Sequence, residues 1–159
     1  MPPEKHALLG ASSAERWLMC PPSARLGEQF PDTASEYAAA GTLAHAIAEL
    51  KARKYFVEPM SNRAFNARLK KLKEDPHYDK GMDAATDTYL EHLKALAISY
   101  GSVQPFVALE TRVDFGDCVP EGFGTTDCII IGAGRMCVAD YKNGAGVLVE
   151  ACLLYTSPS

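Results

Sequence analysis

DCIIIGAGRMCVADYK, residues 127–142, is the stretch that decides the fold. Two runs rich in Ile, Val and Met flank the tetrapeptide GAGR, which is typical of antiparallel strands joined by a two-residue turn at residues 133–134. We expect these strands to cover residues 127–131 and 136–141. The Val- and Phe-containing residues 106–115 have the composition of a third strand that precedes them.

The position of the turn also predicts which side chains meet. Counting back from the turn, Asp127 faces Asp140, and Lys142 lies on the same side of the sheet two residues further on. Two carboxylates this close repel each other unless one is protonated or a cation lies between them, and carboxylate oxygens suit Mg²⁺ or Mn²⁺. The alternative is an ordinary ion cluster on the sheet surface, and the spacing alone does not decide between the two.

The residues before the strands have helical rather than alternating periodicity. Gly41 lies inside one of these segments and costs about 1 kcal/mol relative to Ala, which indicates a packing or functional reason for it. The predicted fold is therefore of the α/β (α+β) class, a helical N-terminal region followed by a three-stranded antiparallel meander. The expected helices are a short one that starts at Ser12-Ser13 and is stopped by Pro21-Pro22, then residues 35–55, 62–73 and 78–99.

Composition narrows the class of protein. The chain has 159 residues, 47% of them hydrophobic, and a formal net charge of −4. No apolar run approaches the ~20 residues of a membrane helix, and the N-terminus lacks the apolar core of a signal peptide. The five cysteines are widely spaced and form no C-x-x-C pair, which argues against a disulfide framework or a self-contained zinc site. We expect a soluble, cytoplasmic protein without a membrane partner.

Positive charge is concentrated in residues 51–74. This segment has eight of the sixteen Lys and Arg residues against two acidic ones, a net charge of +6, which leaves −10 for the remainder. Clustered positive charge on an acidic protein suits a polyanion such as DNA, although a solvated helix face is the alternative. The candidate nucleic-acid-binding residues are Lys51, Arg53, Lys54, Arg63, Arg68, Lys70, Lys71 and Lys73.

Three short motifs occur in one order along the chain. They are GTLAH (41–45), GFGTTD (122–127) and DYKNG (140–144). In this order they resemble the motifs of RecB-like nucleases of the PD-(D/E)xK superfamily, which share the restriction-endonuclease fold. The opening SSAERWLMCPPSARL (12–26) is also similar to the start of that group. The resemblance extends from residue 6 to about 148, and it is closest to a phage- and prophage-associated domain family of uncharacterised function.

The resemblance implies a role for individual residues. Glu49 lies one helical turn after His45 and is a candidate auxiliary group. Glu110, on the first strand, is a weaker candidate, for which the alternative is an exposed strand glutamate. By the same resemblance, the ligands of a Mg²⁺ or Mn²⁺ ion are His45, Asp127 and Asp140, and the catalytic residues are Lys142, Asp140 and Asp127.

The activity implied is hydrolysis of DNA phosphodiester bonds, with exonuclease action in phage recombination or repair. DNA is then the expected partner, together with phage recombination proteins. An alternative from another class is a catalytically inactive nucleic-acid-binding module of the same fold. Metal-dependent cleavage of DNA separates the two.

The chain departs from the family pattern in two ways. The Gln-x-x-x-Tyr motif expected after the last catalytic strand is missing, and residues 152–159 match a translated sequencing adapter. We therefore expect residues 1–151 to be the N-terminal part of one nuclease domain that is active at its full natural length, and the truncated chain to be inactive. A four-cysteine iron–sulfur cluster, present in some members, is not expected, because Cys118, Cys128 and Cys137 lie at the wrong places.

Overall fold

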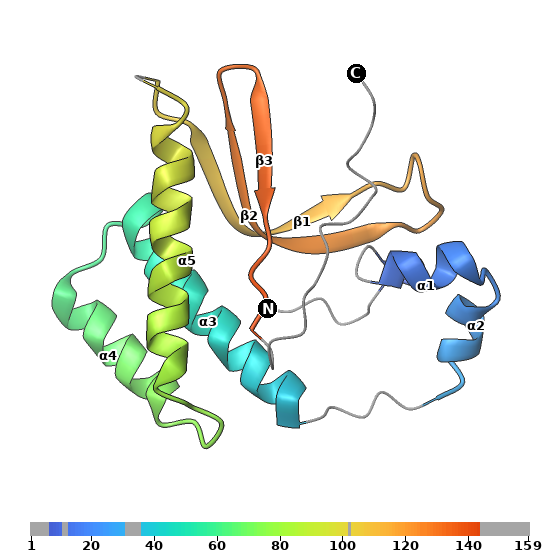
Figure 1. Cartoon of the computed structure of the whole chain (residues 1–159), viewed down its shortest axis with the longest axis horizontal. Helices are drawn as coiled ribbons and strands as arrows, with labels where there is room; N and C mark the ends of the chain where they lie inside the picture. The colour runs from blue at the N-terminus through green and yellow to red at the C-terminus, as the bar shows by residue number, and fades with distance from the viewer. Residues whose placement is uncertain (1–6, 11–12, 31–35, 102, 144–159) are drawn as a thin grey trace.

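Five helices precede three strands in the described part of the computed structural model, which comprises residues 7–10, 13–30, 36–101 and 103–143 (Figure 1). This order confirms the α+β class with a helical N-terminal region. The domain boundary expected at residue 151 and the tail 152–159 lie outside the described residues. The elements are α1 (Ala14–Met19), α2 (Ser23–Gly27), α3 (Glu36–Phe56), α4 (Asn62–Lys73), α5 (Gly81–Ile98), β1 (Phe106–Asp114), β2 (Phe123–Gly132) and β3 (Arg135–Ala139).

The β2–β3 hairpin has the register that the sequence predicts. Gly132 pairs with Arg135, and the strands continue antiparallel from there. Ala133 and Gly134 have φ values of 47° and 72°. A type I′ turn needs left-handed backbone at both central residues, and this turn type matches the twist of the strands that it joins. β3 ends at Ala139, two residues earlier than expected.

β1 pairs antiparallel with β2, which is therefore the central strand of the sheet. The ladder is interrupted at Glu110, whose φ is 47°, a left-handed value that is uncommon for a residue with a Cβ atom. The pairs on either side keep one register, so Glu110 lies opposite Asp127. Both strands bend sharply midway along their length (Figure 1).

The helices follow the sequence pattern closely. α4 has the predicted bounds, and α3 and α5 differ from their predicted ranges by at most three residues at either end. α2 was not predicted, because Pro21-Pro22 ends α1 and yet Pro22 also precedes the first residue of α2. Proline is tolerated at a helix start, where its missing N–H has no intrahelical partner. At Gly41 a Cβ atom would meet nothing within 4 Å, so close packing does not explain this glycine.

The core lies between α3, α5 and one face of the sheet. Ile47 and Ala52 of α3, Leu93 of α5, and Cys128 and Ile130 of β2 all have 0% exposure. Full burial of one Ile or Leu side chain contributes about 1.5–3 kcal/mol to stability. These contacts fix α3 against β2 and thereby hold the functional side chains of both elements in place.

The other face of the sheet leaves apolar side chains in contact with solvent. The register aligns Phe106, Ile131 and Met136 in one row across the three strands, and their exposures are 64%, 43% and 64%.

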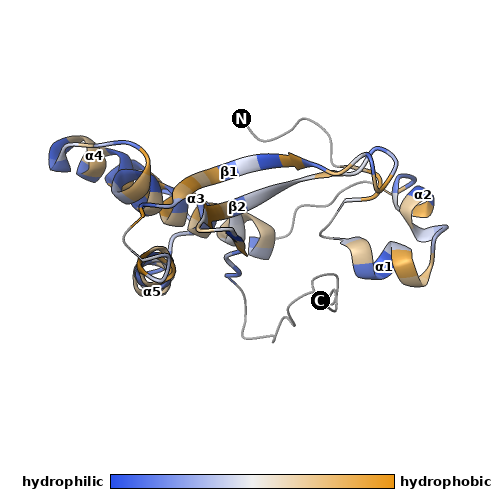
Figure 2. Cartoon of the chain, turned by 90° about the horizontal axis from the view of Figure 1, so that it is seen from above, coloured by the Kyte–Doolittle hydropathy of each residue, from blue (hydrophilic) through white to orange (hydrophobic). Residues whose placement is uncertain are grey.

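The strongly hydrophilic α4 lies beyond the sheet, at the opposite end from α1 and α2 (Figure 2). In the described part of the chain, no helix is both long and apolar enough to cross a membrane.

Candidate metal centre

His45 projects from α3 toward the central strand. Its neighbours Ala44 and Ile47 are fully buried, while 31% of the His45 side chain is exposed. The imidazole Nδ1 lies 3.3 Å from Oδ1 of Asp127, and the ring packs edge-on against Tyr141 at a centroid distance of 5.3 Å. The hydrogen bond to Asp127 raises the pKa of His45 above its ordinary value, and burial opposes this effect only in part.

Asp127 is held in place through both of its carboxylate oxygens. Oδ1 faces His45, and Oδ2 accepts a hydrogen bond from the backbone N–H of Tyr141 at 2.5 Å. Burial alone would raise the pKa of Asp127, but the hydrogen bonds from His45 and Tyr141 outweigh it, and the pKa lies below its ordinary value. The carboxylate is therefore charged and fixed at neutral pH.

Glu110 lies close to His45 and Asp127 and is the third member of this group of side chains. Its left-handed backbone occurs within a β-strand, where it costs on the order of 1–3 kcal/mol, and such strain is frequent at functional sites. Glu110 is an exposed residue of the strand, as the alternative expected, but partial desolvation, together with the negative charges of Asp127 and Glu49, raises the pKa of its carboxyl group. A positive ion beside this carboxylate would relieve the repulsion.

The three side chains form a candidate donor set for one metal ion. Ligand atoms of His45, Glu110 and Asp127 all lie within 4.8 Å of one another, and metal–ligand bonds of about 2.0–2.6 Å span at most about 4.0–5.2 Å between two ligands, so a small inward movement of the side chains lets all three bind one ion. One imidazole nitrogen with two carboxylate oxygens suits Mn²⁺ better than Mg²⁺, because Mg²⁺ prefers oxygen ligands alone.

Asp140 is not part of this group, although the sequence predicted it as a ligand. Its carboxylate lies 2.8 Å from Nζ of Lys142, and both side chains are at least half exposed. The reason is that β3 ends at Ala139, so the ladder no longer holds Asp140, while Tyr141 turns into the core with 7% exposure. Lys142 still lies near the centre, since its charge lowers the pKa of both His45 and Asp127.

Residues 6–154 match the model of a family described as a protein of unknown function (DUF2800). The chain belongs to this family. No solved structure matches it. The match covers the whole region over which the motifs were recognised, and it confirms the coarser prediction of a domain family of uncharacterised function.

Glu49, the predicted auxiliary residue of the DUF2800 domain, lies beside the centre. It acts on the pKa of Glu110 through its charge, as does Arg53. The Arg53 guanidinium donates hydrogen bonds to Glu49 Oε1 from two nitrogens, with Nε at 3.1 Å. Glu49 is thus paired with Arg53 within its own helix rather than free to bind an ion.

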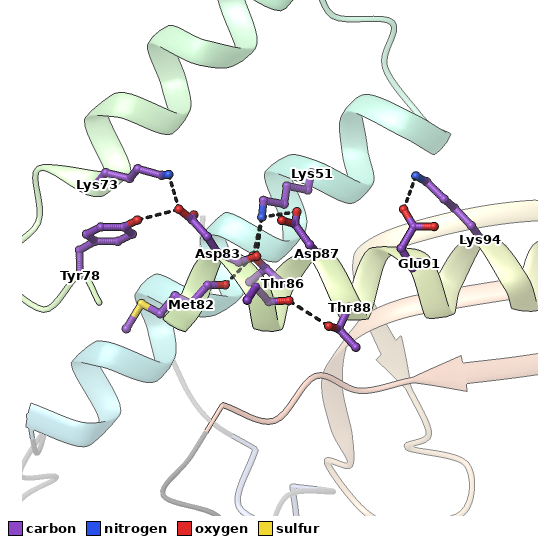
Figure 3. Close-up of polar contacts among 11 residues, drawn as sticks. Lys51, Lys73, Tyr78, Met82, Asp83, Thr86, Asp87, Thr88, Glu91 and Lys94 are labelled. Carbon is purple, nitrogen blue, oxygen red and sulfur yellow. Dashed lines mark hydrogen bonds and ion pairs between the residues drawn. The ribbon is translucent and has the colours of Figure 1, made fainter. Parts of the chain in front are cut away.

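Two of the predicted nucleic-acid-binding lysines have structural partners instead (Figure 3). Lys51 is only 8% exposed, and its Nζ donates to the carbonyl of Asp83, to Thr86 Oγ1 and to Asp87 Oδ1. Lys51 therefore joins α3 to α5 and does not belong to an exposed basic surface. Lys73 forms an ion pair with Asp83.

The remaining basic residues of the segment differ in their surroundings. The ammonium of Lys54 lies 4.2 Å from the centroid of the Phe65 ring and donates to Asn62. Four side chains of α4 are exposed and have no hydrogen bond or ion pair to any other residue that the structure describes. They are Arg63, Arg68, Lys70 and Lys71.

Sequence reasoning missed the part played by Tyr141. Its N–H holds Asp127, its ring contacts His45, and it also packs on Tyr89 of α5 at 5.1 Å. The hydroxyl of Tyr89 is buried without a hydrogen-bond partner among the described residues. An aromatic residue between the Asp and Lys of the DYK motif was the available signal, because alternation places it on the opposite side of the strand from both.

Proposed function

We propose that this protein is a metal-dependent nuclease that hydrolyses DNA phosphodiester bonds, and that it belongs to the RecB-like branch of the PD-(D/E)xK superfamily. We further propose exonuclease action in phage recombination or repair. The order of the three sequence motifs supports this assignment. The observation that carries it is the convergence of His45, Glu110 and Asp127 within 4.8 Å.

The side chains of the centre are suited to hold a divalent cation in a fixed position. His45 must lose its proton before Nδ1 can act as a ligand. Asp127 keeps its orientation because the Tyr141 N–H binds Oδ2 and leaves Oδ1 facing the centre. A bound Mn²⁺ or Mg²⁺ supplies Lewis acidity and a lowered pKa for a coordinated water.

Lys142 supplies the positive charge beside this centre. Attack of water on a phosphodiester adds negative charge to the phosphoryl oxygens, which a nearby ammonium stabilises. The same ammonium can donate a proton to the leaving oxygen. Asp140, at 2.8 Å from Lys142 Nζ, then acts as a positioning residue for Lys142.

The test is DNA cleavage by the natural protein at full length, with Mn²⁺, with Mg²⁺ and with a chelator. We expect cleavage that requires metal and falls by at least about 100-fold in Asp127→Asn and in Lys142→Met. Glu91→Gln removes an exposed acid on α5 and is the matched control, with unchanged activity. Cleavage that persists in chelator, or in Asp127→Asn, contradicts the proposal.

The second candidate function is nucleic-acid binding without turnover. It is favoured by the position of Asp140, whose carboxylate is half exposed, pairs with Lys142 and is not one of the three gathered donors. In that case DNA binds to wild type and Asp127→Asn equally, and neither protein cleaves it with any metal.

A further inference from the structure

A groove of about 530 Å³ lies between α3 and α4. It starts beside the candidate metal centre, since Ala46, which follows His45, and Glu49, one turn further on, are among its lining residues. The other lining residues are Leu43, Leu50, Arg53, Arg68, Lys71, Leu72 and Asp75.

Charge in this groove is unbalanced in favour of cations. Arg53 is paired with Glu49, and Asp75 accepts hydrogen bonds from the backbone and ring of His77. Arg68 and Lys71, by contrast, have no such partner in the described part of the chain. The lining as a whole has three cations, Arg53, Arg68 and Lys71, against the two carboxylates of Glu49 and Asp75, so its net charge is +1, and the two cations without an ion pair among the described residues both lie on the wall contributed by α4.

Leucine side chains form the apolar part of the groove lining. Leu43 and Leu50 of α3 are 7% and 8% exposed, and Leu72 of α4 is partly buried. Apolar surface between cationic side chains suits a ligand with alternating apolar and anionic parts. A single strand of nucleic acid has that character, because its bases and sugars are apolar on their faces and its phosphates are charged.

We propose that the α3–α4 groove binds the phosphate backbone of a single DNA strand and leads it to the metal centre, with Arg68 and Lys71 as the phosphate contacts. This inference rests on the proposed nuclease function and names the form of its substrate. The groove lies within the size range of about 300–1,000 Å³ that is usual for small-ligand pockets, so it receives one or two nucleotides of a strand rather than a duplex.

α4 provides its own matched control. An α-helix turns by about 100° per residue, so Arg63 and Lys70, seven positions apart, lie on one face. Arg68 and Lys71 lie on a different face, toward α3, as their place in the groove lining requires. Each pair has one Arg and one Lys on the same exposed helix, so equal substitutions change net charge equally.

The experiment compares Arg68→Gln/Lys71→Gln with Arg63→Gln/Lys70→Gln in the full-length protein. Fluorescence anisotropy with a labelled single-stranded oligonucleotide, in the absence of divalent metal, gives affinity over a range of salt concentrations. We expect the groove pair to lose at least tenfold in affinity and about 1.4 in the slope of log K against log salt, from two lost phosphate contacts. The inference confines the phosphate contacts to the groove, so the control pair, although the charge of residues 51–74 also made both residues DNA-binding candidates, stays within twofold of wild type.

Several results overturn the inference. One is equal loss in both pairs, which shows attraction by net charge alone. Another is tighter binding of a duplex than of the single strand. A third is equal competition by polyglutamate, which identifies the groove as a site for acidic peptides. Circular dichroism confirms that both variants are folded.

Hydrolysis of bis(4-nitrophenyl) phosphate with Mn²⁺ separates this inference from the proposed function, because the small ester needs the centre but not the groove. If the ester is hydrolysed and strand affinity is insensitive to the groove pair, the groove inference is wrong and the nuclease stands. If the ester is inert and the groove pair alone weakens strand binding, the groove stands and the nuclease is wrong.

Discussion

Glu110 and Asp127 lie opposite each other across the β1–β2 ladder, at a point where left-handed backbone interrupts the ladder. Together with His45 they bring two carboxylates and an imidazole within 4.8 Å. Strain at Glu110 and repulsion between the two acids both cost stability, and a metal ion offsets the repulsion. We therefore expect this arrangement of side chains to lower the stability of the metal-free protein and to raise its affinity for a metal ion.

Glu110→Gly should raise the stability of the metal-free protein and lower its affinity for Mn²⁺. Glycine adopts φ near 47° without the Cβ penalty, and the repulsion with Asp127 disappears, so the metal-free protein should gain about 1 kcal/mol of unfolding free energy. Affinity for Mn²⁺ should fall by at least about tenfold, as is common when groups around a metal are changed. Chemical denaturation and Mn²⁺ titration calorimetry measure the two effects.

The control for this substitution is Glu121→Gly. Glu121 also has a left-handed φ, of 56°, but it lies in the turn between β1 and β2. Its replacement should raise stability by a similar amount and leave Mn²⁺ affinity unchanged. Equal Mn²⁺ affinity in Glu110→Gly and Glu121→Gly would exclude Glu110 from the ligand set.

Gly41→Ala should stabilise the protein by about 0.5–1 kcal/mol. Gly41 lies inside α3, and an added Cβ meets nothing within 4 Å, so alanine gains helix propensity at no steric cost. For a domain of this size the melting temperature should rise by roughly 2–4 °C per kcal/mol. A lower melting temperature would show that something approaches this glycine. Loss of DNA cleavage with raised stability would place a bound strand there.

Lys51→Met should destabilise the protein without weakening DNA binding by the folded molecules. Thr86 is fully buried and loses a hydrogen bond, whereas Asp87 is 64% exposed and can be hydrated, so we expect a cost of about 2–3 kcal/mol. Lys94→Met, which breaks a surface pair with Glu91 and the contact of the ammonium with the Tyr55 ring, should cost no more than about 1 kcal/mol. If folded Lys51→Met bound DNA more weakly than wild type, Lys51 would be one of the residues that contact DNA.

The sequence predicted well where the relevant signal is local. A two-residue turn at Ala133 and Gly134 determines the register of the hairpin from Gly132 back to Cys128, the residue next to Asp127. The burial of Lys51 was missed although a local signal existed, because Lys51 lies four residues after the buried Ile47 and so falls on the apolar stripe of α3. Its charge alone suggested a surface position.

Two features of the centre had no local signal. Nothing in the residues around Glu110 requires left-handed backbone, which arises where β1 and β2 bend against the helices. The early end of β3 depends likewise on Tyr141, whose ring packs between His45 and Tyr89 and pulls the chain out of the ladder. Tertiary packing therefore brings Glu110, rather than Asp140, close to His45 and Asp127.

The packing of α4 on α5 should depend on pH through Asp83. Desolvation would raise the pKa of Asp83, but hydrogen bonds from Lys73 and Tyr78 outweigh it, and the pKa lies below its ordinary value of 3.8. A lowered folded-state pKa gives stability that is present above the unfolded pKa and is lost as pH falls through the folded one. Asp83→Asn should therefore melt below wild type at pH 7, and the difference should shrink below about pH 4.

Lys73→Met tests whether the ion pair is the cause. It should reproduce the pH dependence of Asp83→Asn, and the double variant should lose less than the sum of the two single variants, because they remove one shared interaction. Additive losses, or a difference between wild type and Asp83→Asn that is constant from pH 3 to pH 7, would contradict this account.

Met136→Lys should raise solubility and leave stability unchanged within about 0.5 kcal/mol. Met136 lies on the edge strand β3 and is 64% exposed, in one row with Phe106 and Ile131. An exposed apolar edge promotes pairing between molecules, and a lysine on the edge opposes it. Light scattering during concentration and a thermal melt measure the two effects.

Ile130→Lys, on the buried face, is the contrasting control and should prevent folding, since Ile130 has 0% exposure. If Met136→Lys costs more than about 1 kcal/mol, this face of the sheet is covered in solution.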